Sequence, residues 1–379
     1  MDVRARTVAM LLVAVALVPI AAIAPARAAS GQLVLISQGE ELDVYNPATG
    51  HFFKNGEALV KKTDWVNGTP CYIPGDRRGR FLEADDNPKV DLTGVSKTFD
   101  GDTMPFWGIF NKDGSFTHVA VPSYVHGFGK ELHLTDPAGC AFDAKGNFIG
   151  VDVGSNHTPT QGNGKVVLFF ADAKFSKYCV LDSKISQAGF PAFDASGNLL
   201  VPATGEGMIY KFSHLPTKST DACAPQRSTF MNGFTNGIGT PISIVRGPAN
   251  KGWTVGSVLA PSGVFHIGDA GMLDGIIAAP LPTAGTPFGI CYDKAGNLYY
   301  ADLAIGPNPD PTDPIETQSH AGSLKWVPSG TLSFNLPGAP TISLGPLPVA
   351  QTVVGTTGMD FADGVWVVSA SAVPARFSR

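Results

Sequence analysis

The chain has 379 residues, of which 44 % are hydrophobic and only 16 % are charged, and it contains 44 glycines and 30 prolines. Disordered chains have the opposite balance of hydrophobic and charged residues, so the Gly and Pro excess indicates a folded protein with many turns. The formal net charge of −5 argues against a nucleic-acid-binding protein, which needs a basic face.

The N-terminal segment, residues 1–28, has the pattern of a secretory signal peptide. Arg4 and Arg6 precede an apolar run over 8–24, and Ala26-Arg27-Ala28 fits the small-x-small rule for cleavage. We therefore expect export to the periplasm or out of the cell, with no stable membrane insertion after cleavage. The alternative is an uncleaved membrane anchor. Pro19 argues against it, because this proline interrupts the apolar run.

Residues 29–379 are predicted to form one domain built from a repeat. In each copy an apolar strand enters an Asp-x-x-Gly turn and a β-rich strand returns; Asp bonds the following backbone and Gly supplies a positive φ. Weaker copies occupy 240–258 and 356–370. The strong copies have their turns at Asp76–Gly79, Asp143–Gly146, Asp194–Gly197 and Asp293–Gly296.

Six copies, each supplemented by further apolar runs, predict an all-β fold, the six-bladed β-propeller. The last copy ends near Ala372 after two or three strands, whereas 32–50 holds two strands and no such turn. We expect these N- and C-terminal strands to share the last blade, which closes the ring and removes exposed sheet edges.

Two insertions interrupt the repeat, residues 87–135 and the Pro/Asp-rich stretch 305–322. Long loops in compact domains are often functional. Tolerated surface insertions remain the alternative.

The five cysteines include no C-x-x-C pair, which excludes a zinc knuckle or a thioredoxin-like motif. Export permits disulfides, and Cys179 with Cys223 is the predicted pair because both fall in predicted loops. The alternative is that every cysteine is a small buried hydrophobe.

The stretches 137–152, PAGCAFDAKGNFIGVD, and 287–302, PFGICYDKAGNLYYAD, resemble NHL-type repeats. The resemblance implies a six-bladed propeller. It leaves the activity open, because that superfamily includes protein-binding modules, gluconolactonase-like and paraoxonase-like hydrolases, strictosidine-synthase-like enzymes and lyases. The Asn-Arg pair that usually follows the repeat is absent here.

Three aspartates, Asp85, Asp152 and Asp302, end the second strand of their copies. Alternate strands run in opposite directions, so we expect these residues at the face opposite the Asp-x-x-Gly turns, close to the central channel. Oxygen-rich groups on several blades would suit Ca²⁺. In gluconolactonase-like propellers, which the chain resembles, a divalent ion polarises a lactone carbonyl and activates water.

By that resemblance Asp302 and Asp152 are the first candidates for metal ligand or base. The predicted catalytic residues are Asp302 and His157. The alternative is structural: each aspartate bonds backbone amides, and His157 is an ordinary loop histidine. The predicted metal ligands are Asp85, Asp152, Asn156, Glu206 and Asp302.

Two functions follow. The first is an exported, monomeric propeller that binds a small molecule or a protein partner at its channel mouth. The second is a Ca²⁺-dependent lactonase or esterase. The chain contains no G-x-S-x-G, H-E-x-x-H or P-loop motif. A mouth lined by converging oxygens would favour the hydrolase, and a mouth lined by apolar groups would favour the binding protein.

Overall fold

The computed structural model describes 32–37, 42–46, 51–52, 59, 70–85, 106–119, 132–134, 137–154, 157–158, 161–258, 262–278, 287–293, 295–302, 323–327, 329, 333–334, 341–343, 347–348 and 369–374. The predicted signal peptide and the insertion 305–322 lie outside these residues, as does most of 87–135. Among the described residues, no helix is long and apolar enough to cross a membrane.

The described strands form six sheets of four or more strands and one two-stranded ribbon, β10 (His157–Thr158) with β11 (Gln161–Gly162). We number the six sheets by their innermost strands in chain order. Sheet 1 is β4 (Cys71–Tyr72), β5 (Phe81–Asp85), β6 (Phe106–Phe110) and β7 (Phe116–Val119). Sheet 2 is β8 (Pro137–Phe142), β9 (Phe148–Asp152), β12 (Gly164–Phe169) and β13 (Tyr178–Ile185). Sheet 3 is β14 (Ala192–Phe193), β15 (Leu199–Ala203), β16 (Met208–Ser213) and β17 (Gln226–Asn232).

Sheet 4 has six strands: β18 (Pro241–Arg246), β19 (Trp253–Ser257), β20 (Gly263–Ile267), β21 (Leu273–Ala278), β26 (Thr341–Ser343) and β25 (Ser333–Phe334). Sheet 5 is β22 (Pro287–Tyr292), β23 (Leu298–Asp302), β24 (Ser323–Val327) and β27 (Leu347–Pro348). Sheet 6 is β28 (Ser369–Pro374), β1 (Gln32–Ser37), β2 (Leu42–Asn46) and β3 (His51–Phe52). Short 3₁₀ segments are η4 (Ala171–Ala173), η5 (Thr204–Glu206) and η6 (Pro248–Asn250).

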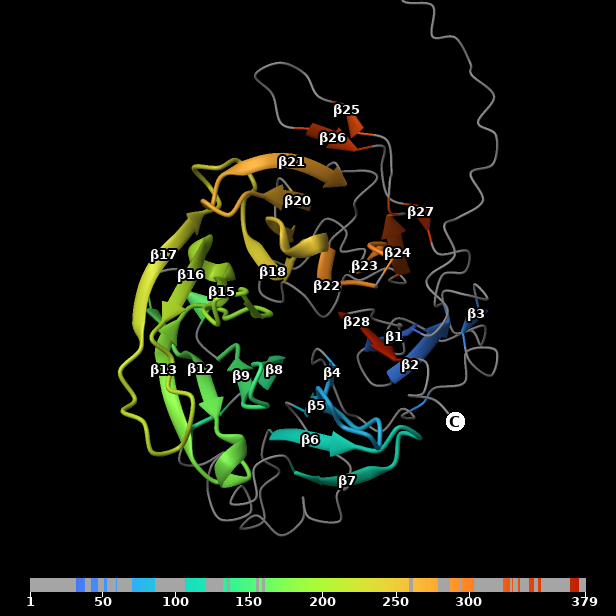
Figure 1. Ribbon diagram of the computed structural model, residues 1–379. Coiled ribbons are helices and arrows are strands. Elements are labelled where there is room, and N and C mark those ends of the chain that lie inside the picture. The colour runs from blue at the N-terminus through green and yellow to red at the C-terminus, as the bar shows by residue number, and fades with distance from the viewer. Residues whose placement is uncertain are drawn as a thin grey trace, which may run out of the picture.

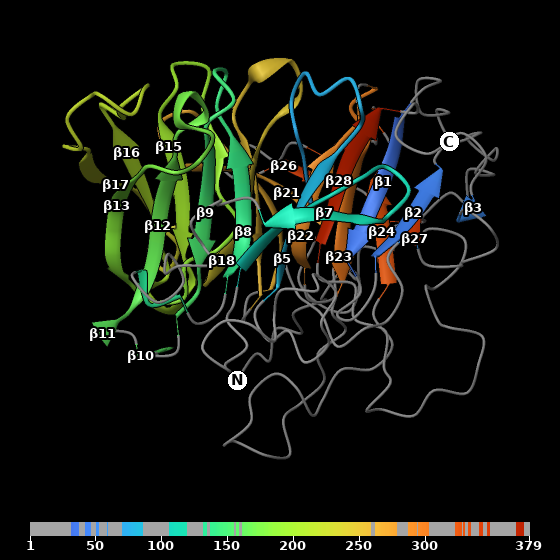
Figure 2. The same cartoon turned by 90° about the horizontal axis from the view of Figure 1, so that it is seen from below.

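The sheets stand around a common axis, as the all-β propeller prediction requires (Figure 1). Seen from the side, innermost strands such as β8 and β28 run roughly along that axis (Figure 2). Neighbouring innermost strands contact one another in chain order, β4 with β8, β8 with β14, β14 with β18, β18 with β22, β22 with β28, and β28 with β4. The ring is therefore closed.

The two ends of the chain share sheet 6, as predicted. β28 pairs antiparallel with β1, from Gln32 opposite Pro374 to Ser37 opposite Ser369. The C-terminal side supplies one described strand of this sheet, and the N-terminal side supplies three. Because β28 pairs with the inner edge of β1, the N-terminal strand is not left as an open sheet edge.

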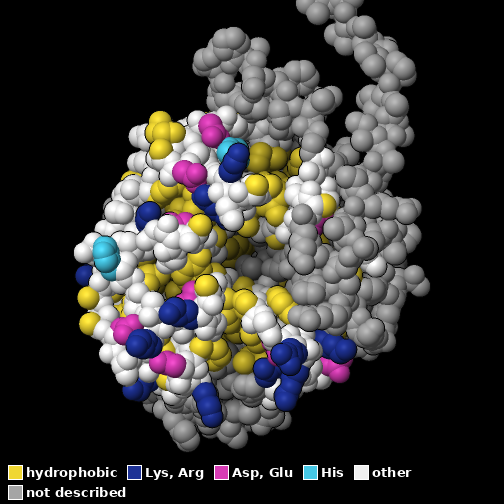
Figure 3. Space-filling model, in the orientation of Figure 1, with side chains coloured by type: hydrophobic (Ala, Val, Ile, Leu, Met, Phe, Trp, Pro, Cys, Tyr) yellow, Lys and Arg dark blue, Asp and Glu magenta, His cyan; other side chains and the backbone are white. Residues whose placement is uncertain are grey.

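The core lies between adjacent sheets, which explains why β9 is buried at all five positions. A strand with a sheet on either side must be apolar on both faces. Between sheets 1 and 2, Trp107 packs edge-on against Phe169, and Phe148 stacks on Phe169 with ring centroids 4.6 Å apart. Gly150 is required there, because a Cβ would lie 2.7 Å from the Trp107 ring. Around the axis, hydrophobic side chains line the described side of a central hollow (Figure 3).

The Asp-x-x-Gly turns have the predicted geometry. Asp143 Oδ1 accepts hydrogen bonds from the Lys145 and Asn147 amides at 2.8 and 2.9 Å, and Oδ2 accepts one from Asn147 Nδ2 at 2.8 Å. Gly146 has φ +84°. In the first copy Arg80 replaces the asparagine, and its amide and Nε donate to Asp76 Oδ2 at 2.8 and 2.9 Å. These carboxylates are therefore occupied within their own turns.

The turn at Asp194 carries a testable pH dependence. Burial alone raises the pKa of Asp194, but hydrogen bonds from the Asn198 side chain, the Asn198 amide and the Ser196 amide outweigh it and hold the pKa below the ordinary 3.8. A pKa lowered by folding stabilises the protein above the unfolded value, and this contribution is lost as the pH falls through the folded value.

We expect Asp194→Asn to cost about 1.5–3 kcal/mol near neutral pH, the usual worth of a hydrogen bond to a charged group. The new amide also opposes the Nδ2 of Asn198, which donates to Oδ2 at 2.7 Å. Urea unfolding at about pH 7 and about pH 3 should show the deficit shrinking in acid. Ser196→Ala, which keeps the backbone donor, is the matched control, and a pH-independent deficit would contradict the assignment.

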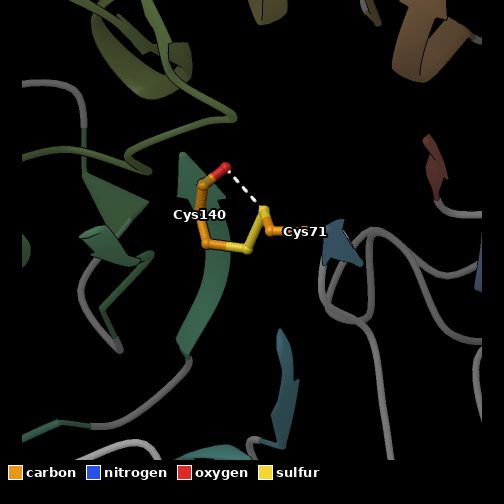
Figure 4. The surroundings of a disulfide bond; sticks show 2 residues. All are labelled: Cys71 and Cys140. Atoms are coloured by element: carbon orange, nitrogen blue, oxygen red, sulfur yellow. Dashed lines mark hydrogen bonds between the residues drawn. A yellow bond between two sulfur atoms is a disulfide. The ribbon is translucent and has the colours of Figure 1, made fainter. Parts of the chain in front are cut away.

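Two disulfides join adjacent sheets. Cys71 on β4 is bonded to Cys140 on β8, so the link connects the innermost strands of sheets 1 and 2 (Figure 4). The 2.9 Å approach of Cys71 Sγ to the Cys140 carbonyl oxygen is a close contact rather than a hydrogen bond, because a disulfide sulfur carries no proton. Cys179 is bonded to Cys223.

The Cys179–Cys223 pair was predicted and is confirmed, although Cys179 lies in β13 rather than in a loop. The Cys71–Cys140 pair was not predicted. Cys291 is buried and belongs to neither disulfide. Two disulfides indicate folding in an oxidising compartment, which agrees with the expected export.

Candidate functional site

The second strands that end in the predicted aspartates terminate at one end of the propeller axis. Asp152 lies opposite Pro137, and Asp302 lies opposite Pro287, so both end a second strand where the innermost strand of their sheet begins. Ser257 lies opposite Pro241 in sheet 4. We call this end, which is opposite the Asp-x-x-Gly turns, the axial mouth.

An apolar cluster lies at the axial mouth. Ala138, Phe190 and Ile242 are buried, and they come from sheets 2, 3 and 4. Phe288 from sheet 5 is partly buried against them, and its ring meets that of Phe190 edge-on with centroids 5.3 Å apart. We call these residues, together with the partly buried Val153 and Val258, the apolar mouth cluster.

The backbone fixes Phe190 against the neighbouring sheet. Its amide donates to the Ile242 carbonyl at 2.8 Å, and its carbonyl accepts from the Ile244 amide at 3.3 Å. Gly189 makes this approach possible, because a Cβ there would lie 2.1 Å from the Ile242 carbonyl oxygen. Phe190 lies two residues before β14 of sheet 3, and Phe288 lies on β22 of sheet 5. Sheet 4 separates these two sheets, so the ring pair bridges the mouth beside the axis.

Asp152, a predicted metal ligand, is fully buried and forms an ion pair with Lys165. The Lys165 Nζ lies 3.3 Å from Asp152 Oδ2, and it also donates to the carbonyls of His133 and Asn163 at 2.9 and 3.0 Å. Three acceptors use all three ammonium protons. A cation bound at Asp152 would have to compete with this ammonium, so the local chemistry fits a structural ion pair better than a calcium ligand.

Glu206, a second predicted ligand, belongs to the boundary between sheets 2 and 3. Its Oε1 accepts the Ser186 amide at 2.9 Å, and its Oε2 accepts a hydrogen bond from the Tyr210 hydroxyl. Burial and the Glu206 carboxylate raise the pKa of Tyr210 to about 12, so the phenol stays protonated and donates. Arg227 lies 4.5 Å over the Tyr210 ring and pairs with Asp182 at 2.5 Å.

The remaining predicted residues are placed only by their backbones or not at all. Asp85 ends β5, Asp302 ends β23 and His157 begins β10, and their side chains lie outside the described part of the structure. Asn156 lies outside the described residues altogether. Among the side chains that the structure does describe, no three His, Cys, Asp or Glu are grouped as a metal site would require. The calcium assignment stays a prediction.

No protein-family model and no curated protein sequence matches the chain. Among solved structures, it is similar to luciferin-regenerating enzyme, with a TM-score of 0.56 and 13 % identity over 79 % of this chain and 88 % of that one. It is also similar to a protein of unknown function from Bacteroides caccae, with a TM-score of 0.49 and 11 % identity over 91 % and 99 % of the two chains. The chain has a β-propeller fold. At such identity the first likeness shows the fold alone.

Sequence reasoning missed the apolar mouth cluster of this propeller, although a signal was present. Innermost strands of three sheets begin with proline followed directly by an apolar residue, as in Pro137-Ala138, Pro241-Ile242 and Pro287-Phe288. Proline at a strand start forgoes no ladder hydrogen bond. The residue after it is then placed at the mouth, next to the axis.

Proposed function

We propose that this chain is an exported, monomeric six-bladed propeller of the NHL-like type that binds an apolar group of a small molecule or protein partner at the axial mouth. The apolar mouth cluster carries the proposal. Binding sites for organic ligands are mostly apolar with a few polar groups. Phe288, Val153 and Val258 remain partly exposed where four sheets converge.

Six blades follow if β18–β21 are the fourth blade. These strands form a complete antiparallel four-stranded unit, β18-β19-β20-β21. β26 joins β21 in parallel, with Gly275 opposite Thr341, and β25 then pairs with β26. The two extra strands lie between β24 and β27 of sheet 5 in the chain, so they are an addition to the rim of the fourth blade.

Two of the predicted metal ligands have protein partners, and these partners support a binding function over Ca²⁺-dependent hydrolysis. Asp152 is paired with Lys165, and Glu206 is engaged by Ser186 and Tyr210. Both carboxylates have structural roles that explain their positions. The similarity to luciferin-regenerating enzyme indicates that a propeller of this shape can host catalysis, so the test must be able to detect turnover.

Phe288→Ala should weaken binding of the hydrophobic dye 1-anilinonaphthalene-8-sulfonate to the mature chain, 29–379, by roughly tenfold. Full burial of a Phe side chain contributes about 1.5–3 kcal/mol, and the partly buried Phe288 corresponds to the lower end of that range. Phe234→Ala is the matched control, because Phe234 is 60 % exposed in the turn after β17. Fluorescence titration measures both affinities, and circular dichroism verifies folding. Equal affinity for the two variants would overturn the proposal, and so would Ca²⁺-dependent turnover of a lactone and ester panel.

A further inference from the structure

The segment 214–225 leaves sheet 3 after β16 and lies against the neighbouring sheet 2 before it returns as β17. We call it the strap. Leu215 packs against the hydrophobic cluster between the two sheets. Cys223 is bonded to Cys179 on β13, the outermost strand of sheet 2, and its Sγ lies 3.8 Å from the Val180 carbonyl oxygen. The strap thus borders the outer edge of sheet 2.

The other contacts between the strap and sheet 2 are few and mostly exposed. Asp172 accepts hydrogen bonds from the Ser219 amide and hydroxyl at 3.1–3.3 Å, and Asn147 Nδ2 donates to the Thr217 carbonyl at 3.2 Å. Residues 220–224 are exposed, whereas Pro216 is buried and Leu215 packs in the cluster between the sheets. A hydrogen bond contributes only about 0.5–1.5 kcal/mol, so the disulfide is the principal tether of residues 217–225, the part of the strap beyond Pro216.

The two disulfides differ in access. Cys71 and Cys140 are both buried at the axis, 9 % and 5 % exposed, whereas Cys223 is exposed and only its partner Cys179 is buried. Thiol–disulfide exchange requires a thiolate to reach one sulfur along the S–S axis, so access decides which bond reacts. Cys223 Sγ is the sulfur that a reductant can reach.

We propose that Cys179–Cys223 is a redox latch that holds the strap and is opened by a dithiol reductant, such as a thiol–disulfide oxidoreductase of the export compartment. A reductant thiolate attacks Cys223 Sγ, and Cys179 leaves as a thiolate and takes up a proton. The second reductant thiol resolves the mixed disulfide, so the reductant becomes a disulfide and the protein gains two electrons and two protons. The strap then detaches from β13, while the Cys71–Cys140 disulfide continues to join the innermost strands of sheets 1 and 2.

Release would free the outer edge of β13 (Tyr178–Ile185) where Cys223 now lies against it, beside Cys179 and Val180. An open strand edge is a template for pairing with another chain. The strap in its latched form lies beside that edge at Cys179 and Val180, and we expect the reduced form to present this part of the edge. The device therefore couples the redox state of one disulfide to the availability of one sheet edge.

The strap contains a trypsin site, the Lys218–Ser219 bond, which reports its release. Graded dithiothreitol, followed by alkylation and peptide mass spectrometry, should label Cys179 and Cys223 at lower reductant than Cys71 and Cys140. Cleavage after Lys218 should rise in step, by roughly tenfold or more, as expected when a local tether is lost, with the circular dichroism of the sheets unchanged.

A Cys179→Ser/Cys223→Ser variant should be cut after Lys218 without reductant at the rate of the reduced wild type. Cys291→Ala, which removes a thiol outside the strap, should be cut at the rate of the oxidised wild type. The proposal would be overturned if Cys71–Cys140 were reduced before Cys179–Cys223 or together with it. It would also be overturned if the rate of cleavage after Lys218 were the same with Cys179–Cys223 oxidised and reduced. The wild-type titration remains decisive if the double variant fails to fold.

Discussion

Lys165→Met is expected to destabilise the propeller by about 3–5 kcal/mol, the usual cost of leaving one buried charge without its partner. Asp152 is fully buried, and the Lys165 ammonium lies 3.3 Å from its carboxylate. The substitution also leaves the His133 and Asn163 carbonyls without the donor that joins them. Urea unfolding near neutral pH measures the loss.

Two companion variants make this result specific. Lys211→Met removes a more exposed ion pair, 3.6 Å from Asp194, and should cost at most about 1 kcal/mol. Asp152→Asn/Lys165→Met removes both charges and should be less damaging than Lys165→Met alone, because no uncompensated carboxylate remains. A loss for Lys165→Met no larger than that for Lys211→Met would refute a structural ion pair at the axial mouth.

Cys71→Ser/Cys140→Ser is expected to reduce the free energy of unfolding by about 4 kcal/mol, the chain-entropy estimate for a loop of this length. The two cysteines are 69 residues apart and close a loop that holds most of sheet 1. The bond also fixes β8, the strand that carries Ala138 to the mouth. We therefore expect weaker dye binding at the mouth in this variant, measured by the same fluorescence titration.

The comparison should be made without reductant, with urea unfolding as the measure of stability. Cys291→Ala is the control for loss of a buried sulfur that belongs to no disulfide. Equal unfolding free energies for the double variant and Cys291→Ala would contradict a stabilising role for the inner disulfide.

The repeat and its turns could be predicted because they are local. Asp143, Gly146 and Asn147 lie within five residues, and the hydrogen bonds that join Asp143 to Asn147 need no partner from elsewhere in the chain. Closure of the ring could also be predicted from the sequence. The last copy of the repeat is incomplete, the chain begins with strands that belong to no copy, and a ring requires the two to pair. The blade-packing positions followed from continuous apolar runs such as 148–151.

The site was harder to predict than the repeat, because its properties depend on contacts between neighbouring strands and between sheets. Asp152 was recognised by its alignment, but its role is set by Lys165, which lies directly opposite on β12. Pairing 148–152 against 165–169 in antiparallel register would have shown the opposite charges. Nothing local indicates that Phe190 and Phe288, almost a hundred residues apart in the chain, share one ring contact. The Cys71–Cys140 bond likewise joins two sheets through residues that are distant in sequence.

The pairing of β28 with β1 also sets the order of events during biosynthesis. β1 is among the first strands to be made, yet its inner neighbour, residues 369–374, comes almost last. Until then one edge of β1 is open, and contacts so distant in sequence form slowly. A nascent or truncated chain therefore carries an unsatisfied strand edge through nearly all of its synthesis. We therefore expect that edge to need protection from aggregation until residues 369–374 have been made.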